Sequence, residues 1–102
     1  MSIKLVMLKS GENIVSEIKE MVSENDKVIG YFLEKPCTVN LKKNDSEEDA
    51  FKITLFPWAP LTKTKQIPIP NDWVITIVDP IDKILEIYQR DIVNAETEDY
   101  FE

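Results

Sequence analysis

Short β-prone stretches alternate with clusters of turn residues along this chain, and this alternation constrains the fold more than any other feature. Apolar and β-branched residues dominate 3–8, 14–22, 28–41, 51–56 and 73–78. Each stretch is followed by Ser, Gly, Asn, Asp or Pro, which favour turns. The pattern predicts five strands, the third long and bent at Pro36, because proline interrupts strand pairing locally. Pro57 and Pro60 predict an irregular segment after the fourth strand, in which 63–70 keep an extended bias.

One helix is expected after the last strand. Asp79 suits an N-cap, Pro80 suits the first helical position, and Asp82 follows three residues after the cap. Five apolar residues then recur at helical spacing and form one stripe: Ile81, Ile84, Leu85, Tyr88 and Ile92. A helix from about residue 80 is therefore predicted to cover one end of an all-β core.

The length of 102 residues suits one domain, which we place at 1–93. The net charge is −7, from 19 acids and 12 bases, but the chain up to Arg90 holds 14 acids against 12 bases. The acidic excess is therefore concentrated toward the end, and 94–102 are interpreted as an acidic, frayed tail. The highly charged segment 42–50 is expected to be an exposed hairpin loop.

The composition argues against an enzyme. The chain has no histidine, which excludes Ser-His-Asp and Cys-His catalysis and His-based zinc sites. Its one cysteine, Cys37, is expected to be a buried small hydrophobe, and no disulfide can form within the chain. We predict no catalytic residue, no metal and no cofactor. The apolar runs are too short to span a membrane, so we expect no membrane partner and a cytoplasmic location.

Four segments carry a resemblance to a known family: Lys4 to Glu12, Glu34-Lys35-Pro36, Phe56-Pro57-Trp58-Ala59-Pro60, and Trp73 to Pro80 leading into Ile84 to Tyr88. With them the chain resembles Sm-like (LSm) proteins, most closely the small Sm-like proteins of marine bacteriophages of the cyanophage type. The resemblance implies five strongly bent antiparallel strands in a small open barrel with a C-terminal helix. It also implies a cyclic homo-oligomer, acting in the host cytosol if the gene belongs to a phage.

An open sheet also favours a ring on physical grounds, because two unpaired edges can join head to tail. The resemblance implies that the fourth strand of one subunit pairs with the fifth strand of the next. The interface candidates are Phe56, Trp58, Val74 and Ile75. Phe56 and Trp73 are also expected to contribute to the core.

The resemblance further implies binding of single-stranded RNA. Our candidates are the loop residues Asn25, Asp26 and Lys27, the aromatic Tyr31, and the basic pair Lys63 and Lys65. The Arg-Gly pair that Sm proteins carry before the fifth strand is absent, and Asn71-Asp72-Trp73 stands there instead. The alternative is an oligomeric scaffold that binds a phage or host protein and no nucleic acid.

Overall fold

The protein is mostly β, with one C-terminal helix. The computed structural model describes residues 2–43 and 51–93; most of the predicted loop and all of the predicted acidic tail lie outside these ranges. The strands are β1 (Ser2–Leu8), β2 (Asn13–Val22), β3 (Val28–Lys43), β4 (Phe51–Pro57), β5 (Gln66–Pro70) and β6 (Val74–Val78). A 3-10 turn, η1 (Asn71–Trp73), precedes β6, and α1 (Asp82–Tyr88) continues into a π-helical turn, η2 (Gln89–Val93).

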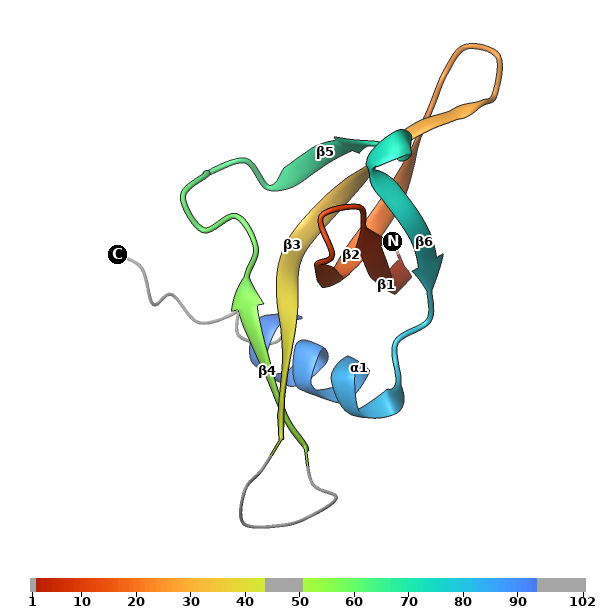
Figure 1. Cartoon of the computed structure of the whole chain (residues 1–102). Coiled ribbons are helices and arrows are strands. Elements are labelled where there is room, and N and C mark those ends of the chain that lie inside the picture. The colour runs from red at the N-terminus through yellow and green to blue at the C-terminus, as the bar shows by residue number, and fades with distance from the viewer. Residues whose placement is uncertain (1, 44–50, 94–102) are drawn as a thin grey trace.

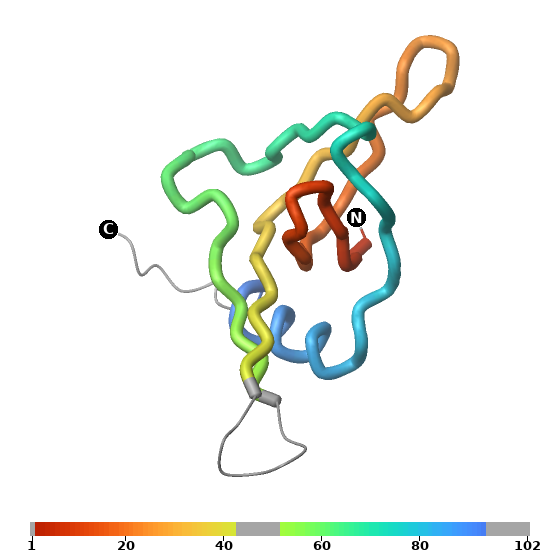
Figure 2. Tube along the Cα trace, viewed as in Figure 1, coloured from red at the N-terminus to blue at the C-terminus, as the bar shows by residue number. Residues whose placement is uncertain are grey.

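The strands form one antiparallel sheet in the order β4-β3-β2-β1-β6, with β5 also paired to β3 (Figure 1). The sheet does not close, because no pairing joins β4 to β6 among the described residues. The tube in Figure 2 shows β6 and β4 on opposite sides of the molecule. The prediction of a bent, open antiparallel sheet with a terminal helix is confirmed at this level.

Strand β3 organises the sheet because it is 16 residues long and bends in the middle. Its first half pairs with β5, from Gly30↔Pro70 to Glu34↔Gln66, and its second half pairs with β4, from Cys37↔Pro57 onward. The register with β2 shifts between these halves, where Lys35 adopts a positive φ of 53°. The predicted bend beside Pro36 is confirmed, and it takes the form of a β-bulge.

The predicted count of five strands is wrong, because β5 adds a sixth within the described chain. Pro68 and Pro70 disfavour a strand, since neither has an N–H to donate. They are alternate residues, however, so the N–H groups of Ile67 and Ile69 can serve the ladder with β3 while the proline nitrogens face away from it.

The helix starts at Asp82, not at about residue 80, and its N-cap is Ile81, which makes no side-chain capping bond. The predicted cap, Asp79, instead forms an ion pair with Lys4 of β1. Ile81 is 61% exposed, so its place in the apolar stripe is also wrong. The residues that α1 buries are Ile84, Ile87 and Tyr88.

Two apolar clusters form the core. The first contains Val6, Leu8, Ile14, Leu33 and Ile69, and the second contains Val15, Cys37, Ile84 and Tyr88. The neighbours Ile14 and Val15 belong to different clusters because successive strand side chains point to opposite faces. The start of β2 is therefore buried on both faces, and α1 covers the second cluster.

The exposed fractions of Cys37, Phe56 and Trp73 differ widely. Cys37 is 2% exposed, which confirms its burial. Phe56 is 64% exposed and Trp73 is 45% exposed, so their predicted place in the core is wrong. Phe56 lies on β4 and Trp73 lies in η1 directly before β6, so both are at the ends of the sheet.

Candidate functional site

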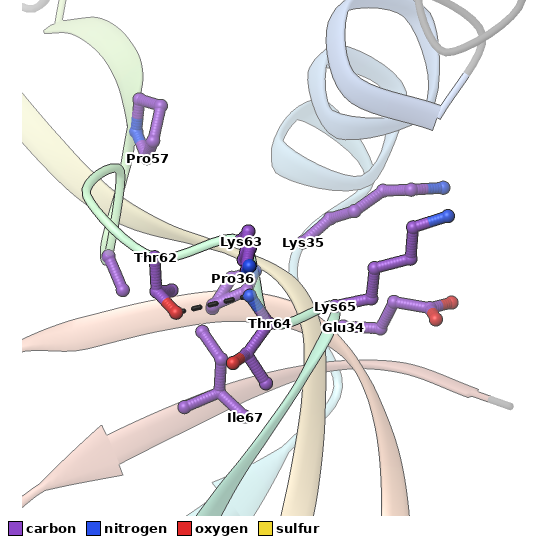
Figure 3. Close-up of a pocket in the computed structure, with 10 residues that line it drawn as sticks. Glu34, Lys35, Pro36, Pro57, Thr62, Lys63, Thr64, Lys65 and Ile67 are labelled. Carbon is purple, nitrogen blue, oxygen red and sulfur yellow. Dashed lines mark hydrogen bonds between the residues drawn. The ribbon is translucent and has the colours of Figure 1, made fainter.

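The bend of β3 helps to form a cavity of about 250 Å³, which we call the basic pocket (Figure 3). One part of its wall comes from the bend itself and the other from the segment between β4 and the start of β5. The lining residues are Glu34, Lys35, Pro36, Pro57, Ala59, Thr62, Lys63, Thr64, Lys65 and Ile67. The pocket thus brings together both halves of the basic pair predicted from sequence, and adds Lys35.

Positive charge exceeds negative charge in the pocket, with three lysines against Glu34. Lys35 Nζ lies 3.7 Å from Oε2 of Glu17, which compensates part of its charge. Among the described residues, no acidic side chain lies within ion-pair distance of Lys63 or Lys65. Figure 3 shows the chains of Lys35 and Lys65 extending in the same direction, with Glu34 alongside.

Two threonines complete the polar lining. Oγ1 of Thr62 accepts a hydrogen bond of 3.1 Å from the backbone N–H of Thr64. This bond holds the segment in a local turn. A hydroxyl that accepts one bond can still donate its own hydrogen, so Thr62 keeps a donor for a ligand.

The other predicted nucleic-acid residues lie elsewhere. Asn25, Asp26 and Lys27 occupy the exposed turn between β2 and β3, which projects from the opposite side of the molecule from the segment between β4 and β5 (Figure 1). Oγ of Ser23 accepts bonds of 3.3 Å from the N–H groups of Asn25 and Lys27, and Asp26 has a φ of 60°. These residues stabilise a tight turn and do not join the basic pocket.

Tyr31 lines a second, separate cavity of about 330 Å³, whose lining residues come from β1, β2, β3 and β6. The other lining residues are Ser2, Lys4, Ile18, Glu20 and Ile77. Tyr31 is half-buried and packs against the first core cluster, and the charge of Lys4 is paired with Asp79. The six predicted nucleic-acid residues therefore fall into three separate places.

The predicted interface residues divide into two exposed and two half-buried side chains. Phe56 on β4 is 64% exposed and Ile75 on β6 is 65% exposed. Trp58 packs against the first core cluster, and its Nε1 donates a hydrogen bond of 3.1 Å to Oε2 of Glu12. Val74 also packs against that cluster. Phe56 and Ile75 therefore lie on the two terminal strands of the sheet, far from each other within one copy.

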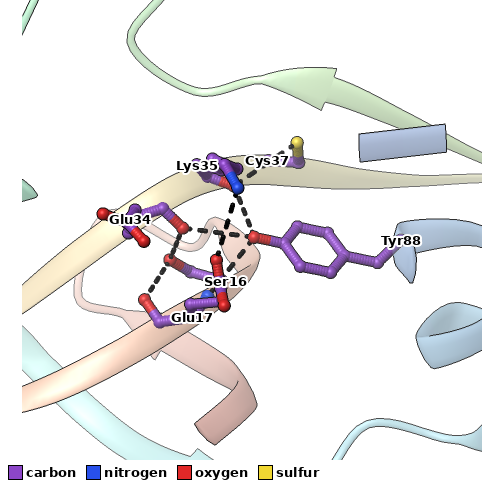
Figure 4. Close-up of polar contacts among 6 residues, drawn as sticks. All are labelled: Ser16, Glu17, Glu34, Lys35, Cys37 and Tyr88. Atoms are coloured by element: carbon purple, nitrogen blue, oxygen red, sulfur yellow. Dashed lines mark hydrogen bonds and ion pairs between the residues drawn. The ribbon is translucent and has the colours of Figure 1, made fainter. Parts of the chain in front are cut away.

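A polar network beneath the bend was not predicted from sequence (Figure 4). The Tyr88 hydroxyl lies 2.9 Å from the Lys35 carbonyl and 3.1 Å from the Glu34 carbonyl, and it accepts a 3.3 Å bond from the N–H of Glu17. Oγ of Ser16 lies 2.8 Å from the Glu17 carbonyl and 3.0 Å from that of Glu34. The only available signal was a serine inside an apolar strand. Tyr88 thus ties α1 to the bend that forms the pocket.

Burial explains the protonation of the two titratable groups near this network. It raises the pKa of the Cys37 thiol to about 11 and raises the pKa of the Tyr88 hydroxyl well above its ordinary value. Both groups are neutral at neutral pH. A neutral buried thiol is a poor nucleophile, so Cys37 serves packing.

The described residues offer neither a metal-binding cluster nor a membrane-spanning helix. Residues 2–43 and 51–93 contain no group of three or more Cys, Asp or Glu side chains arranged to hold a metal ion. In the same ranges, no helix has the length and apolar character needed to cross a membrane.

Comparison with known proteins places the chain in a different group from the one that its motifs suggested. A family model described as "Family of unknown function (DUF6561)" matches residues 1–93. No curated protein matches the chain. The Sm-like resemblance is therefore wrong, and the expectations of a phage origin and of Sm-type RNA recognition lose the basis that it supplied.

Proposed function

The chain belongs to the Family of unknown function (DUF6561), and we propose from its geometry that it is a self-assembling, non-enzymatic binding protein. Copies join head to tail through β4 of one and β6 of the next. The observation that carries this proposal is that the two terminal strands of one sheet both end in open edges beside exposed apolar side chains, Phe56 and Ile75.

Backbone geometry supports β4 as a pairing edge. The N–H of Trp58 donates to the Pro36 carbonyl at 2.9 Å, so this position points toward β3. Because backbone groups alternate in direction along a strand, the N–H and C=O groups of Phe56 and Thr54 also point toward β3. Those of Ile53 and Leu55 point outward, away from the sheet. Those groups need a partner, which another strand can supply.

The outer edge of β5 is different, because two of its three outward-facing residues, Pro68 and Pro70, have no N–H to donate, which leaves only that of Gln66. Proline on an exposed edge is a common protection against unwanted strand pairing. β5 is thus protected, whereas β6 (Val74–Val78) contains no proline. The two ends of the main sheet are therefore the edges at which another chain can add.

Apolar side chains accumulate near both open edges. Beside β6 the exposed ones are Trp73, Ile75, Val78 and Ile81, and in or near the β3–β4 hairpin they are Leu41, Phe56 and Leu61. Exposed apolar groups gathered in this way mark interaction surfaces. A second copy satisfies both requirements at once, since it brings an unpaired strand and an apolar rim. Head-to-tail contacts of this kind close into a ring when the rotation between subunits permits.

Light scattering coupled to size exclusion, at micromolar concentration, tests the assembly. We expect a mass that is a multiple of 11.8 kDa for the wild type and 11.8 kDa for Ile75→Asp. Ile29→Asp is the matched control, because Ile29 is a 49% exposed residue on β3 that is not in the stretch of β3 paired with β4 and does not pair with β6. A monomeric wild type, or equal dissociation by both substitutions, would refute the proposal.

Binding of single-stranded RNA is the second candidate function, and the basic pocket is the observation that favours it. The described residues carry 12 bases and 11 acids, while the other 8 acids lie in 44–50 and 94–102. The body of the protein is thus close to neutral and does not repel a polyanion strongly. Titration of labelled RNA at two salt concentrations tests this function, with steep loss of affinity at higher salt as the expected result.

The scaffold hypothesis, in which the assembly binds another protein and no nucleic acid, is favoured instead if the protein assembles and RNA does not bind. In either case we place the protein in the cytosol. A single buried thiol suits a reducing compartment.

A further inference from the structure

We propose that the basic pocket is a binding site for a phosphate group, held by Lys63 and Lys65 with the hydroxyl of Thr62. This inference deepens the RNA-binding candidate by locating its contact, but the site lies within one copy and does not depend on assembly. A phosphate group can come from an RNA backbone or from a free phosphate compound, and the test below separates these sources.

The shape of the pocket suits a small anion. Its volume of about 250 Å³ falls below the range of about 300–1,000 Å³ that is usual for larger organic ligands. The walls come from the bend of β3 and from the segment carrying Thr62 to Lys65, so two segments distant in sequence line the pocket (Figure 3). A phosphate group is small enough to enter a pocket of this volume and to meet donors of both lysine and threonine in its lining.

The donors of the pocket are of the right chemical type. Ammonium groups bind phosphate as point charges, and threonine hydroxyls add neutral hydrogen bonds. Within the described chain neither Lys63 nor Lys65 has an acidic partner, so binding an anion there breaks no ion pair. Lys35 keeps its contact with Glu17 at 3.7 Å, and its side chain extends in the same direction as that of Lys65, so it adds to the positive field there (Figure 3).

Glu34 makes the pocket selective. Its carboxylate lines the same cavity and repels any ligand that extends toward it. A ligand must therefore present its negative charge toward Lys63 and Lys65 and keep it away from Glu34. A single phosphate group can do so more readily than a ligand whose negative charges extend along the whole pocket. Glu34→Gln is accordingly expected to tighten phosphate binding several-fold, because it removes the repulsion and keeps the side-chain shape.

The experiment compares two double variants of equal charge. Lys63→Ala with Lys65→Ala removes the proposed contacts. Lys42→Ala with Lys52→Ala removes two exposed lysines that face each other in the neighbouring β3–β4 hairpin. One arm follows the binding of a labelled ten-nucleotide single-stranded RNA, and the other follows backbone amide shifts of residues 62–65 during titration with inorganic phosphate.

In the RNA arm, loss of two phosphate contacts should reduce the slope of log affinity against log salt by about 1.4. When the salt concentration rises from about 50 to about 200 mM, the fold-loss of RNA affinity should therefore be about sevenfold smaller for the Lys63→Ala, Lys65→Ala variant than for the wild type. In the phosphate arm, the amide shifts of 62–65 should saturate in the wild type and in the Lys42→Ala, Lys52→Ala variant (the hairpin pair). They should vanish in the Lys63→Ala, Lys65→Ala variant (the pocket pair).

The two arms identify the source of the phosphate. Saturable shifts with inorganic phosphate and no RNA binding indicate a free phosphate compound, whereas RNA binding that depends on the pocket pair indicates a phosphodiester. The proposal is overturned if neither arm shows binding, or if the hairpin pair reduces binding as much as the pocket pair, since only net charge would then matter. A monomeric protein that binds phosphate refutes the assembly and leaves the pocket intact.

Discussion

Replacement of Tyr88 by phenylalanine tests whether one hydroxyl holds the helix against the bend of β3. Tyr88 is fully buried, and its hydroxyl is 2.9 Å from the Lys35 carbonyl and 3.3 Å from the Glu17 nitrogen. Tyr88→Phe keeps the ring and removes only this hydroxyl. The N–H of Glu17 and the carbonyl of Lys35 then lose their contact with it.

Leaving a buried donor or acceptor without its partner costs about 1–3 kcal/mol. We therefore expect Tyr88→Phe to lower the free energy of unfolding by about 2 kcal/mol. For a domain of this size that corresponds to a fall in Tm of about 8–16 °C. The slope of the urea transition should not change, because the surface exposed on unfolding is the same.

Urea unfolding followed by tryptophan fluorescence and circular dichroism measures this change. Tyr31→Phe is the matched control, since Tyr31 is half-buried and its hydroxyl makes no hydrogen bond within the described residues. The control should stay within about 0.5 kcal/mol of the wild type. Equal stability of the two variants would show that ring packing alone anchors α1, and that the hydroxyl network contributes nothing.

Three other predictions concern stability and reactivity. Gly30→Ala should cost about 1–3 kcal/mol and loosen β5, because a Cβ atom at Gly30 would collide with the Ile69 carbonyl; hydrogen exchange of the β5 amides measures the loosening, and unchanged exchange contradicts it. The pKa of Cys37 is raised from 9.0 to about 11, so its neutral thiol contributes stability fully below about pH 9. That contribution is lost as the pH rises toward 11, and the loss should be smaller in Cys37→Ala; identical alkaline profiles argue against it. Finally, a thiol reagent at pH 8 should modify Cys37 far more slowly in the native protein than in urea, since the side chain is 2% exposed; fast native labelling would refute its burial.

Much of the secondary structure could be predicted from local sequence patterns. Strands β1 to β4 and β6 lie where alternating or continuous apolar stretches indicated them, and the bend of β3 lies beside Pro36. These features depend on residues close together in the chain, namely β-branched side chains, turn residues and proline. The C-terminal helix followed for the same reason, from apolar residues at helical spacing.

The errors arose where a contact with a residue distant in the sequence decided the local structure. Asp79 has the chemistry of an N-cap, but Lys4 pairs with it, and the helix begins at Asp82. β5 was missed because its two prolines argue against a strand, whereas the ladder with β3 needs N–H donors only from Ile67 and Ile69. A local sequence pattern does not show where a distant strand will lie. The pairing of Asp79 with Lys4 and of β5 with β3 therefore could not be predicted from it.

The candidate site divides along the same line. Sequence alone determined that the chain has no histidine and one cysteine, that most of its excess acid lies outside the body, and that Lys63 and Lys65 are close together. Only the tertiary structure decided that Lys35 joins them, that Tyr31 and Asn25 to Lys27 lie elsewhere, and that Tyr88 supports the bend. The physical reason is that a pocket is formed by pairing and packing between segments up to tens of residues apart, and these contacts depend on the whole fold.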